Sequence, residues 1–213
     1  MRTLHTADAV LAGPGAAPLT GGAVLVDGAA VAAVGPLEAL TAAHPEARVR
    51  RWPGLLTPGL AHRGAAALLE RAYHPDPREA ELLGTEPVTG DALAALALDD
   101  TRRGASARRG LQRLLRHGVT AVAGPFPSPA VHRAVTRAGL LLLPAGDPDA
   151  PVPPLDPLAG HRSPQEAFAG TLAPGARADF AAFDAPDSAA LRERGTGCCV
   201  ATVLAGRLAQ RRT

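Results

Sequence analysis

The strongest local constraint on this chain is a hairpin signal near its N-terminus. Residues 23–26 (Ala-Val-Leu-Val) and residues 31–34 (Val-Ala-Ala-Val) flank the pair Asp27-Gly28. That pair suits the positive φ angles of a tight turn, and the two apolar-rich runs supply antiparallel strands. The pattern predicts that residues 1–57 are mainly β structure.

Two further elements are expected within this N-terminal part. Residues 36–43 are predicted to form a short helix. Residues 47–56 are predicted to form an Arg-rich strand, in which Val49 and Trp52 interrupt the arginines. Both elements would precede the middle of the chain, whose pattern is different.

The middle of the chain alternates between helix and strand signals. Within residues 106–117, Leu111 and Leu114 fall at helical spacing among arginines, and Gly118 is a suitable helix stop. Residues 119–122 (Val-Thr-Ala-Val) then read as a buried strand. This pattern predicts one helix-plus-strand unit.

A second unit follows directly. Ser128-Pro129 offers a helix N-cap and a first-turn proline, Gly139 offers a stop, and residues 140–143 (Leu-Leu-Leu-Leu) supply the next strand. Alternating helices and strands with short connections indicate a parallel α/β layer or part of a barrel. Residues 144–160, rich in Pro, Asp and Gly, are predicted to be a loop.

The C-terminal part returns to strand character. Ser163-Pro164-Gln165-Glu166 matches a capping box at the start of a short helix. Residues 172–183 and 199–208 are then predicted to be strands. The fold class expected for the whole chain is therefore α/β with additional β structure contributed by both ends.

Composition excludes several classes of function. All 22 basic residues are Arg, the net charge is only +2, and aromatic residues make up 3% of the chain. Without a basic block, no nucleic-acid partner is expected. No apolar run approaches the roughly 18 residues of a membrane span, and no signal peptide is visible, so we expect no membrane association and a cytoplasmic location.

The only cysteines, Cys198 and Cys199, are adjacent in the sequence. Adjacent cysteines provide neither a disulfide framework nor the spacing of a zinc knuckle. We expect two buried, reduced thiols.

Taken in order, motifs at the two ends resemble the amidohydrolase superfamily, in its imidazolonepropionase-like and cytosolic deaminase branch. The matching segments are residues 22–28 (Gly-Ala-Val-Leu-Val-Asp-Gly), 31–35, 56–60 (Leu-Thr-Pro-Gly-Leu), 163–167, 172–180 and 203–206. The resemblance implies a composite β-sandwich built from residues 1–57 and 165–213. Residues 58–164 would form a truncated (β/α) barrel-like region, because a full barrel takes about 250 residues.

The resemblance also implies a metal centre, of which few ligands are visible. In the family a His-x-His pair follows Pro-Gly-Leu on the first barrel strand, since two imidazoles from one strand end can share a divalent ion. Here the sequence continues Ala61-His62-Arg63-Gly64. His62 is a candidate zinc or iron ligand, or else a surface or packing residue, and a glycine stands at the position of its partner.

The other expected ligands are histidines on later strands and an aspartate on the last one. His117, His132 and His161 are predicted at a helix end, within a helix and before the capping box, so none ends a strand. Asp147 follows the strand at 140–143 and is either a mimic of the family aspartate or a turn former. His62 and Asp147 are thus the metal candidates, and no catalytic residue is assigned.

Other catalytic motifs are not found. The sequence contains no Gly-x-Ser-x-Gly elbow and no phosphate loop ending in Lys. The segment Tyr73-His74-Pro75-Asp76 is polar enough to line a pocket, but we interpret it as an exposed loop.

The resemblance implies hydrolysis of non-peptide carbon–nitrogen bonds in small cyclic amides or amidines, and the missing ligands predict that this activity is impaired. The alternative is a pseudoenzyme that acts as a non-catalytic binding or scaffold partner of a full-length enzyme. Such a protein would hold a small-molecule ligand or pair with a related enzyme. A homodimer is also expected, because a shortened barrel must cover its strand edges.

Overall fold

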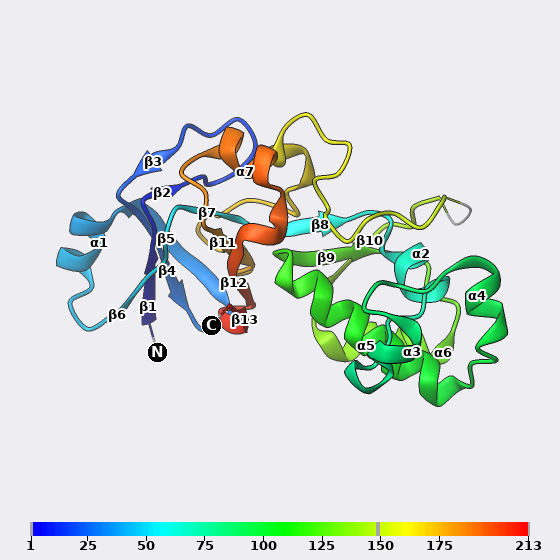
Figure 1. Ribbon diagram of the computed structural model, residues 1–213. Helices are drawn as coiled ribbons and strands as arrows, with labels where there is room; N and C mark the ends of the chain where they lie inside the picture. The colour runs from blue at the N-terminus through cyan, green and yellow to red at the C-terminus, as the bar shows by residue number, and fades with distance from the viewer. Residues whose placement is uncertain (1, 148–149, 213) are drawn as a thin grey trace. The chain divides into compact units, whose positions relative to one another are not determined.

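The computed structural model describes residues 2–147 and 150–212 of the chain (Figure 1). It is a mixed α/β protein, as predicted, and its described strands form three open sheets. The strands are β1 (Arg2–Thr6), β2 (Ala9–Val10), β3 (Leu19–Thr20), β4 (Gly22–Asp27), β5 (Ala30–Pro36), β6 (Arg48–Arg51), β7 (Leu55–Pro58), β8 (Leu60–His62), β9 (Val119–Ala123), β10 (Leu141–Leu143), β11 (Phe180–Phe183), β12 (Cys199–Leu204) and β13 (Arg207–Arg211).

The helices are more numerous than predicted, and α5 begins six residues earlier than predicted. They are α1 (Leu37–Ala43), α2 (Ala65–Glu70), α3 (Ala80–Leu83), α4 (Gly90–Ala95), α5 (Asp100–Arg116), α6 (Pro129–Ala138), α7 (Ser188–Arg194) and the 3₁₀ turns η1 (Pro77–Glu79), η2 (Pro164–Ala167) and η3 (Thr196–Cys198). In the part of the chain that the structure describes, no helix combines the length and apolar character needed to cross a membrane.

The predicted hairpin forms one side of a four-stranded sheet with the order β5-β4-β1-β6, in which β5 is an edge strand. Strands β4 and β5 are antiparallel, with Asp27 opposite Ala30, and Gly28 in the turn has a φ of +60°. Strand β1 pairs with β4 on its other edge. The hairpin predicted at Asp27-Gly28 is confirmed, although the two turn residues are Gly28 and Ala29, and Asp27 is the last residue of β4.

Both ends of the chain contribute to a six-stranded sheet with the order β13-β12-β11-β7-β2-β3. Strand β11, from the C-terminal part, is antiparallel to β7, from the N-terminal part, with Phe180 opposite Pro58 and Phe183 opposite Leu55. This pairing places the strands that flank the middle of the chain at the centre of the sheet.

One hydrophobic core contains side chains from both of these sheets. Val24 and Val31 come from the four-stranded sheet, and Leu56 and Phe180 come from the six-stranded sheet. The buried His5 ring on β1 packs edge-on against Phe180, with the ring centroids 4.8 Å apart. Burial lowers the pKa of His5 to about 4, so its ring is neutral in the core at pH 7.

The prediction of a single strand over residues 47–56 is wrong. The segment divides into β6, which pairs in parallel with β1, and β7, which lies in the other sheet. Gly54 lies between them with a φ of +65°, and a side chain there would collide with the backbone carbonyl oxygens of Phe183 and Ala185. A left-handed glycine at this close approach redirects the chain from one sheet to the other.

The two predicted helix-plus-strand units are confirmed. Helix α5 leads into β9, and α6 leads into β10, which pairs in parallel with β9. The Ser128 hydroxyl accepts a hydrogen bond from the Val131 amide at 3.4 Å, and Gly139 caps α6 with a φ of +74°. The short helices α2, α3 and α4 were not predicted, since their apolar residues lack a clear helical period.

Near the C-terminal part, two expectations are corrected. The Ser163 hydroxyl does cap a turn, by accepting from the Gln165 amide, but the turn is the 3₁₀ segment η2. Only the last four residues of the predicted strand 172–183 form β11. The residues before them bond instead to the N-terminal hairpin, where the Val31 amide donates to the Ala176 carbonyl.

The chain divides into two compact units. The first contains residues 1–61, 115–120 and 156–213, and the second contains residues 62–114 and 121–155. The second unit holds α2 to α4, most of α5, and α6. Three of the boundaries fall within β8, α5 and β9, and the fourth lies between residues 155 and 156. The first unit is therefore made from three separate segments.

Gly118, in the first unit, and Gly139, in the second unit, are both left-handed, and comparing them tests how closely the first unit is packed around Gly118. Gly118 has a φ of +76°, and an added Cβ would lie 2.7 Å from the Phe183 ring; Gly139 has a φ of +74° and open space around it. We expect Gly139→Ala to cost about 1–2 kcal/mol of unfolding free energy from backbone strain alone. Gly118→Ala should cost about 1–3 kcal/mol more, because the methyl group also overpacks the core. Urea unfolding of both variants measures this difference, and equal losses would contradict the packing.

Candidate functional site at the ends of β8, β9 and β10

The candidate site lies where three strands of one sheet end. The sheet has the order β10-β9-β8, and in α/β sheets ligands bind at the carboxyl ends of the strands. The Gly146 amide, in the loop after β10, donates to the Gly124 carbonyl after β9 at 3.0 Å. A Cβ on Gly146 would also lie 3.0 Å from the Arg63 carbonyl oxygen after β8. The three strand ends are thus joined by backbone contacts.

His62, the last residue of β8, is buried at 3% exposure. Its Nε2 atom lies 3.0 Å from the Pro154 carbonyl oxygen. A carbonyl oxygen only accepts, so this hydrogen bond assigns the proton to Nε2 and removes that nitrogen as a metal donor. The geometry favours the packing interpretation of His62.

Gly64 occupies the position where the sequence comparison led us to look for a second histidine. An added Cβ would lie 2.6 Å from Cγ of Pro153. Since Pro153 belongs to the same loop that binds His62 through Pro154, this loop takes the space of a side chain at residue 64. The glycine is therefore required by local packing.

Asp147 is exposed in the loop after β10. The contact of Gly146 with Arg63 brings its segment to the same edge as His62. Across residues 2–147 and 150–212, however, no group of three or more His, Cys, Asp or Glu side chains is placed to hold a metal ion.

The remaining histidines occupy separate environments. His117 Nδ1 lies 2.8 Å from the Thr196 hydroxyl, and burial lowers the pKa of this ring. His161 Nδ1 lies 3.2 Å from a Glu166 carboxylate oxygen. His132 is exposed on α6. The predicted positions of these three residues outside strand ends are confirmed.

A pocket of about 380 Å³ opens beside the ends of β9 and β10. It is lined by Gly124, Pro125, Phe126, Pro127, His132, Leu142, Leu143 and Ala145. Most of these side chains are apolar, and the His132 imidazole is the titratable group among them. Sequence reasoning missed this pocket, although the run Gly-Pro-Phe-Pro after a buried strand is a signal for a rigid loop that places an aromatic ring.

Residues 22–47, which include the predicted hairpin, match the family of imidazolonepropionase-like composite domains of bacteria. The match covers 26 of the 213 residues, and within that segment the chain is similar to an imidazolonepropionase-like composite domain. The resemblance that the sequence motifs indicated is thereby confirmed. No curated protein sequence matches the chain.

Several solved structures resemble this amidohydrolase-like chain. The guanine deaminase of Bradyrhizobium japonicum is 16% identical, with a TM-score of 0.47, and the match covers 68% of this chain and 34% of that chain. The guanine deaminase of E. coli is 15% identical, with a TM-score of 0.48, and the match covers 68% of this chain and 36% of that chain. A molinate hydrolase is 20% identical, with a TM-score of 0.48, and the match covers 68% of this chain and 30% of that chain. This chain spans about a third of the length of these proteins.

The residues at the edge do not fit the metal centre that the resemblance implies. His62 has its Nε2 atom engaged, residue 64 has no space for a side chain, and the described residues contain no group of three or more His, Cys, Asp or Glu side chains placed to hold a metal ion. A divalent ion in a protein needs three or more such ligands. We therefore derive no reaction step through a metal.

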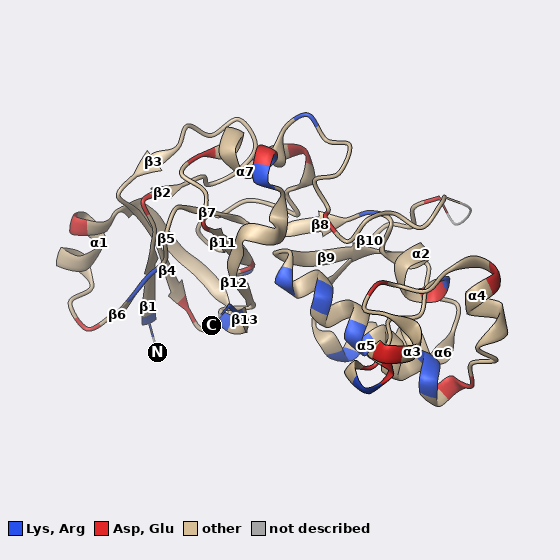
Figure 2. Ribbon diagram, viewed as in Figure 1, with Lys and Arg blue, Asp and Glu red and all other residues tan. Residues whose placement is uncertain are grey.

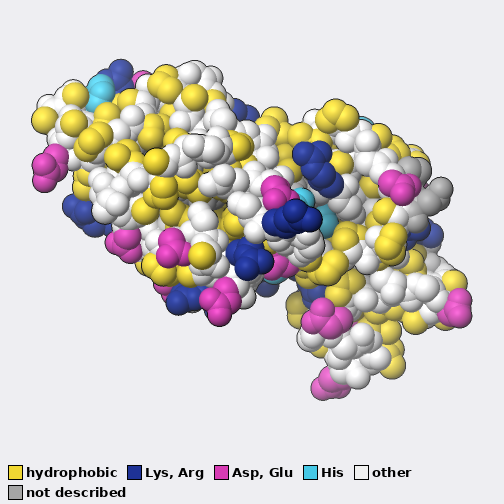
Figure 3. Space-filling view, turned by 90° about the horizontal axis from the view of Figure 1, so that it is seen from above, with side chains coloured by type: hydrophobic (Ala, Val, Ile, Leu, Met, Phe, Trp, Pro, Cys, Tyr) yellow, Lys and Arg dark blue, Asp and Glu magenta, His cyan; other side chains and the backbone are white. Residues whose placement is uncertain are grey.

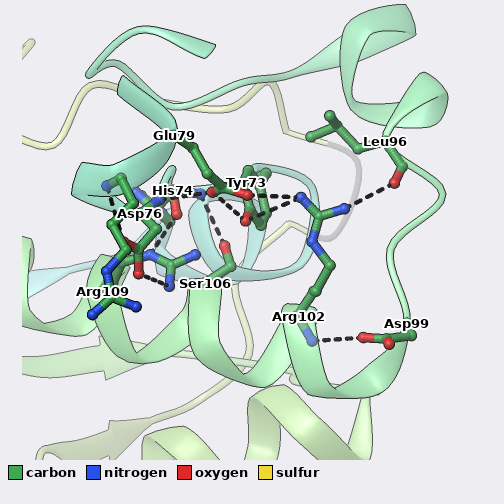
Figure 4. A network of polar contacts seen from close by, with 10 residues as sticks. Tyr73, His74, Asp76, Glu79, Leu96, Asp99, Arg102, Ser106 and Arg109 are labelled. Atoms are coloured by element: carbon green, nitrogen blue, oxygen red, sulfur yellow. Dashed lines mark hydrogen bonds and ion pairs between the residues drawn. The ribbon is translucent and has the colours of Figure 1, made fainter. Parts of the chain in front are cut away.

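The polar segment around Tyr73 is not the exposed loop that we predicted. Tyr73 is 2% exposed and His74 is fully buried against α5. As Figure 4 shows, the Tyr73 hydroxyl donates to Glu79 at 2.6 Å, and Arg102 donates to the other oxygen of that carboxylate at 3.0 Å. The guanidinium groups of Arg102 and Arg109 lie 5.2 and 5.5 Å from the centre of the Tyr73 ring.

This Tyr73 cluster fixes residues 73–79 to α5. The Tyr73 hydroxyl, followed by the Asp76 backbone amide, lowers the pKa of Glu79 by hydrogen bonding to its carboxylate. The His74 amide donates to the Ser106 hydroxyl at 2.9 Å, and burial lowers the pKa of the His74 ring to about 4. Because its carboxylate and phenol bind one another and Arg102, the cluster stabilises the fold and presents no unpaired nucleophile.

Removing the Tyr73 hydroxyl tests this stabilising role. Tyr73→Phe should lower the unfolding free energy by about 1–2 kcal/mol, because Glu79 loses a charge-assisted hydrogen bond. Arg78→Gln, an exposed change in the same segment, should cost less than about 0.5 kcal/mol. Chemical denaturation measures both values, and an unaffected Tyr73→Phe variant would contradict the assigned role.

Proposed function

We propose that this chain is an amidohydrolase-like protein in which hydrolysis of carbon–nitrogen bonds in small cyclic amides or amidines is impaired. We further propose that the pocket beside β9 and β10 retains a binding role. The observation that carries the proposal is the loop at Pro153-Pro154, which engages His62 and fills the space next to Gly64.

Impaired hydrolysis is expected from the chemistry of the residues at the ends of β8, β9 and β10. Attack on an amide or amidine carbon requires an activated water, and expulsion of the nitrogen requires an acid. The His62 ring donates its Nε2 proton to a backbone carbonyl, which holds the ring in one orientation. That bond withdraws the nitrogen and its proton from any water or substrate at the edge.

A binding role is supported by the pocket itself. A volume of about 380 Å³ lies within the range of small-molecule sites, which are mainly apolar with a few polar groups that set orientation. Phe126 and Leu143 supply apolar contacts, and His132 supplies a polar one. The proposed ligand is a small, largely apolar molecule with one group that hydrogen-bonds to an imidazole.

A second candidate role is that of a non-catalytic partner of a related full-length enzyme, or of a second copy of this chain. It is favoured by strand β10, which lies at the edge of its sheet with Leu142 54% exposed. An apolar edge strand is a template for pairing with another chain. Figure 3 shows hydrophobic atoms widely spread on one face of the molecule, with charged side chains scattered among them.

Metal content tests the proposal of impaired hydrolysis. Protein produced with zinc, iron or manganese supplied should hold far less than one ion per chain, because the edge offers too few ligands. His62→Ala and Asp147→Asn should leave that content unchanged. Elemental analysis after gel filtration gives the values. A near-stoichiometric ion that both variants lose would contradict the proposal and justify assays on cyclic amides.

A further inference from the structure

The first unit contains a basic cavity that the amidohydrolase resemblance does not explain. Its volume is about 440 Å³. The residues that line it include Arg116, His117, Cys199, Gln210, Arg211 and Arg212. Figure 2 shows basic residues both on β13 and along α5, the elements that supply these arginines. We call this site the arginine cavity.

Among the described residues that line the arginine cavity, none is acidic. The ion pairs between described residues involve other arginines, so none of Arg116, Arg211 and Arg212 is neutralised by a carboxylate in residues 2–147 and 150–212. Asp156 is the acid whose field acts on His117. Its two oxygens already accept from the Leu158 and Thr196 amides at 2.8 and 3.0 Å.

Contacts within the first unit hold the lining residues in place. The Arg212 guanidinium donates to the Gly197 carbonyl at 3.1 Å, and the Arg212 amide donates to Val200. His117 bonds to the buried Thr196. Arg211 lies over the Trp52 ring, 5.9 Å from its centre, on the face of β13 opposite to Gln210, so its guanidinium does not serve this cavity. Arg212 and His117 are therefore positioned partly by the protein before any ligand arrives, which reduces the entropy lost on binding.

The charge of this cavity selects for anions. Guanidinium groups bind phosphate oxygens through paired hydrogen bonds, and those of Arg116 and Arg212 at one cavity match a phosphate dianion better than a singly charged carboxylate. The thiol of Cys199 does not oppose the anion, because burial raises its pKa to about 11 and keeps it neutral. The cavity is also large enough to hold more than the anionic group alone.

We propose that the arginine cavity binds a small molecule through its phosphate group, with Arg116 and Arg212 as the recognising residues. The phosphate group would lie between α5 and the end of β13, and the rest of the molecule would occupy the remaining volume beside Gln210. The site needs no metal and no part of the second unit's pocket, so it stands whether or not the proposed function does.

Titration calorimetry on the full chain tests this site with inorganic phosphate, ribose 5-phosphate and ribose at constant ionic strength. Both phosphate compounds should bind with one site per chain, and ribose should not bind. Ribose 5-phosphate binding at least tenfold more tightly than inorganic phosphate supports a phosphorylated metabolite, whereas equal affinities support free phosphate as the ligand. Absence of binding by both compounds would overturn the proposal.

Matched variants distinguish phosphate binding in the arginine cavity from attraction of the anion to the positive charge of the whole protein. Arg116→Gln and Arg212→Gln should each weaken binding of ribose 5-phosphate at least tenfold. Arg207→Gln removes the same charge from an exposed position on β13 outside the cavity, and should change the affinity less than twofold. Equal losses in all three variants would show that the anion responds only to net charge, and would overturn the proposal.

Discussion

The structure depends on the backbone pairing of β7 with β11. The two strands come from positions more than 120 residues apart, and they lie side by side at the centre of the six-stranded sheet. Closing so long a loop costs conformational entropy, which must be offset by burial along the pair. Leu55, Leu56, Phe180 and Phe183 are all essentially buried. Gly54 and Gly118 permit this packing, because a side chain at either position would collide with residues of the Phe183 region.

The position of the candidate site depends on the pairing of β7 with β11. Strand β7 continues through Gly59 into β8, which ends at His62, and a side chain on Gly59 would collide with Thr120 of β9. The same arrangement therefore fixes the start of the α/β layer and the edge where its strands end. At that edge the Pro153-Pro154 loop determines which chemistry is accessible, because it engages one imidazole and leaves no space for a second.

The parts of the fold that were predictable from sequence have local causes. Asp27-Gly28, Ser128-Pro129 and Gly139 each act through the backbone of their own turn or cap, and the structure contains all three as predicted. The division of residues 47–56 was not predictable, because it depends on the approach of Phe183 to Gly54. The burial of Tyr73 was missed for a similar reason, since its partners Arg102 and Arg109 lie on a helix about 30 residues later.

The site was predicted only in part. The family motif located the edge after β8, and the glycine at residue 64 indicated a missing ligand. The contact of His62 with Pro154 and the arginine cavity both depend on residues distant in sequence, so neither carries a local signal.

Native-state hydrogen exchange tests most directly the claim that one strand pair joins the two ends of the chain. The amides of β7 and β11 should exchange through one shared opening, with the same free energy and the same response to denaturant, because neither strand stays buried without the other. If the amides of β11 exchanged at a clearly lower free energy than those of β7, the C-terminal part would open independently. That result would contradict the account.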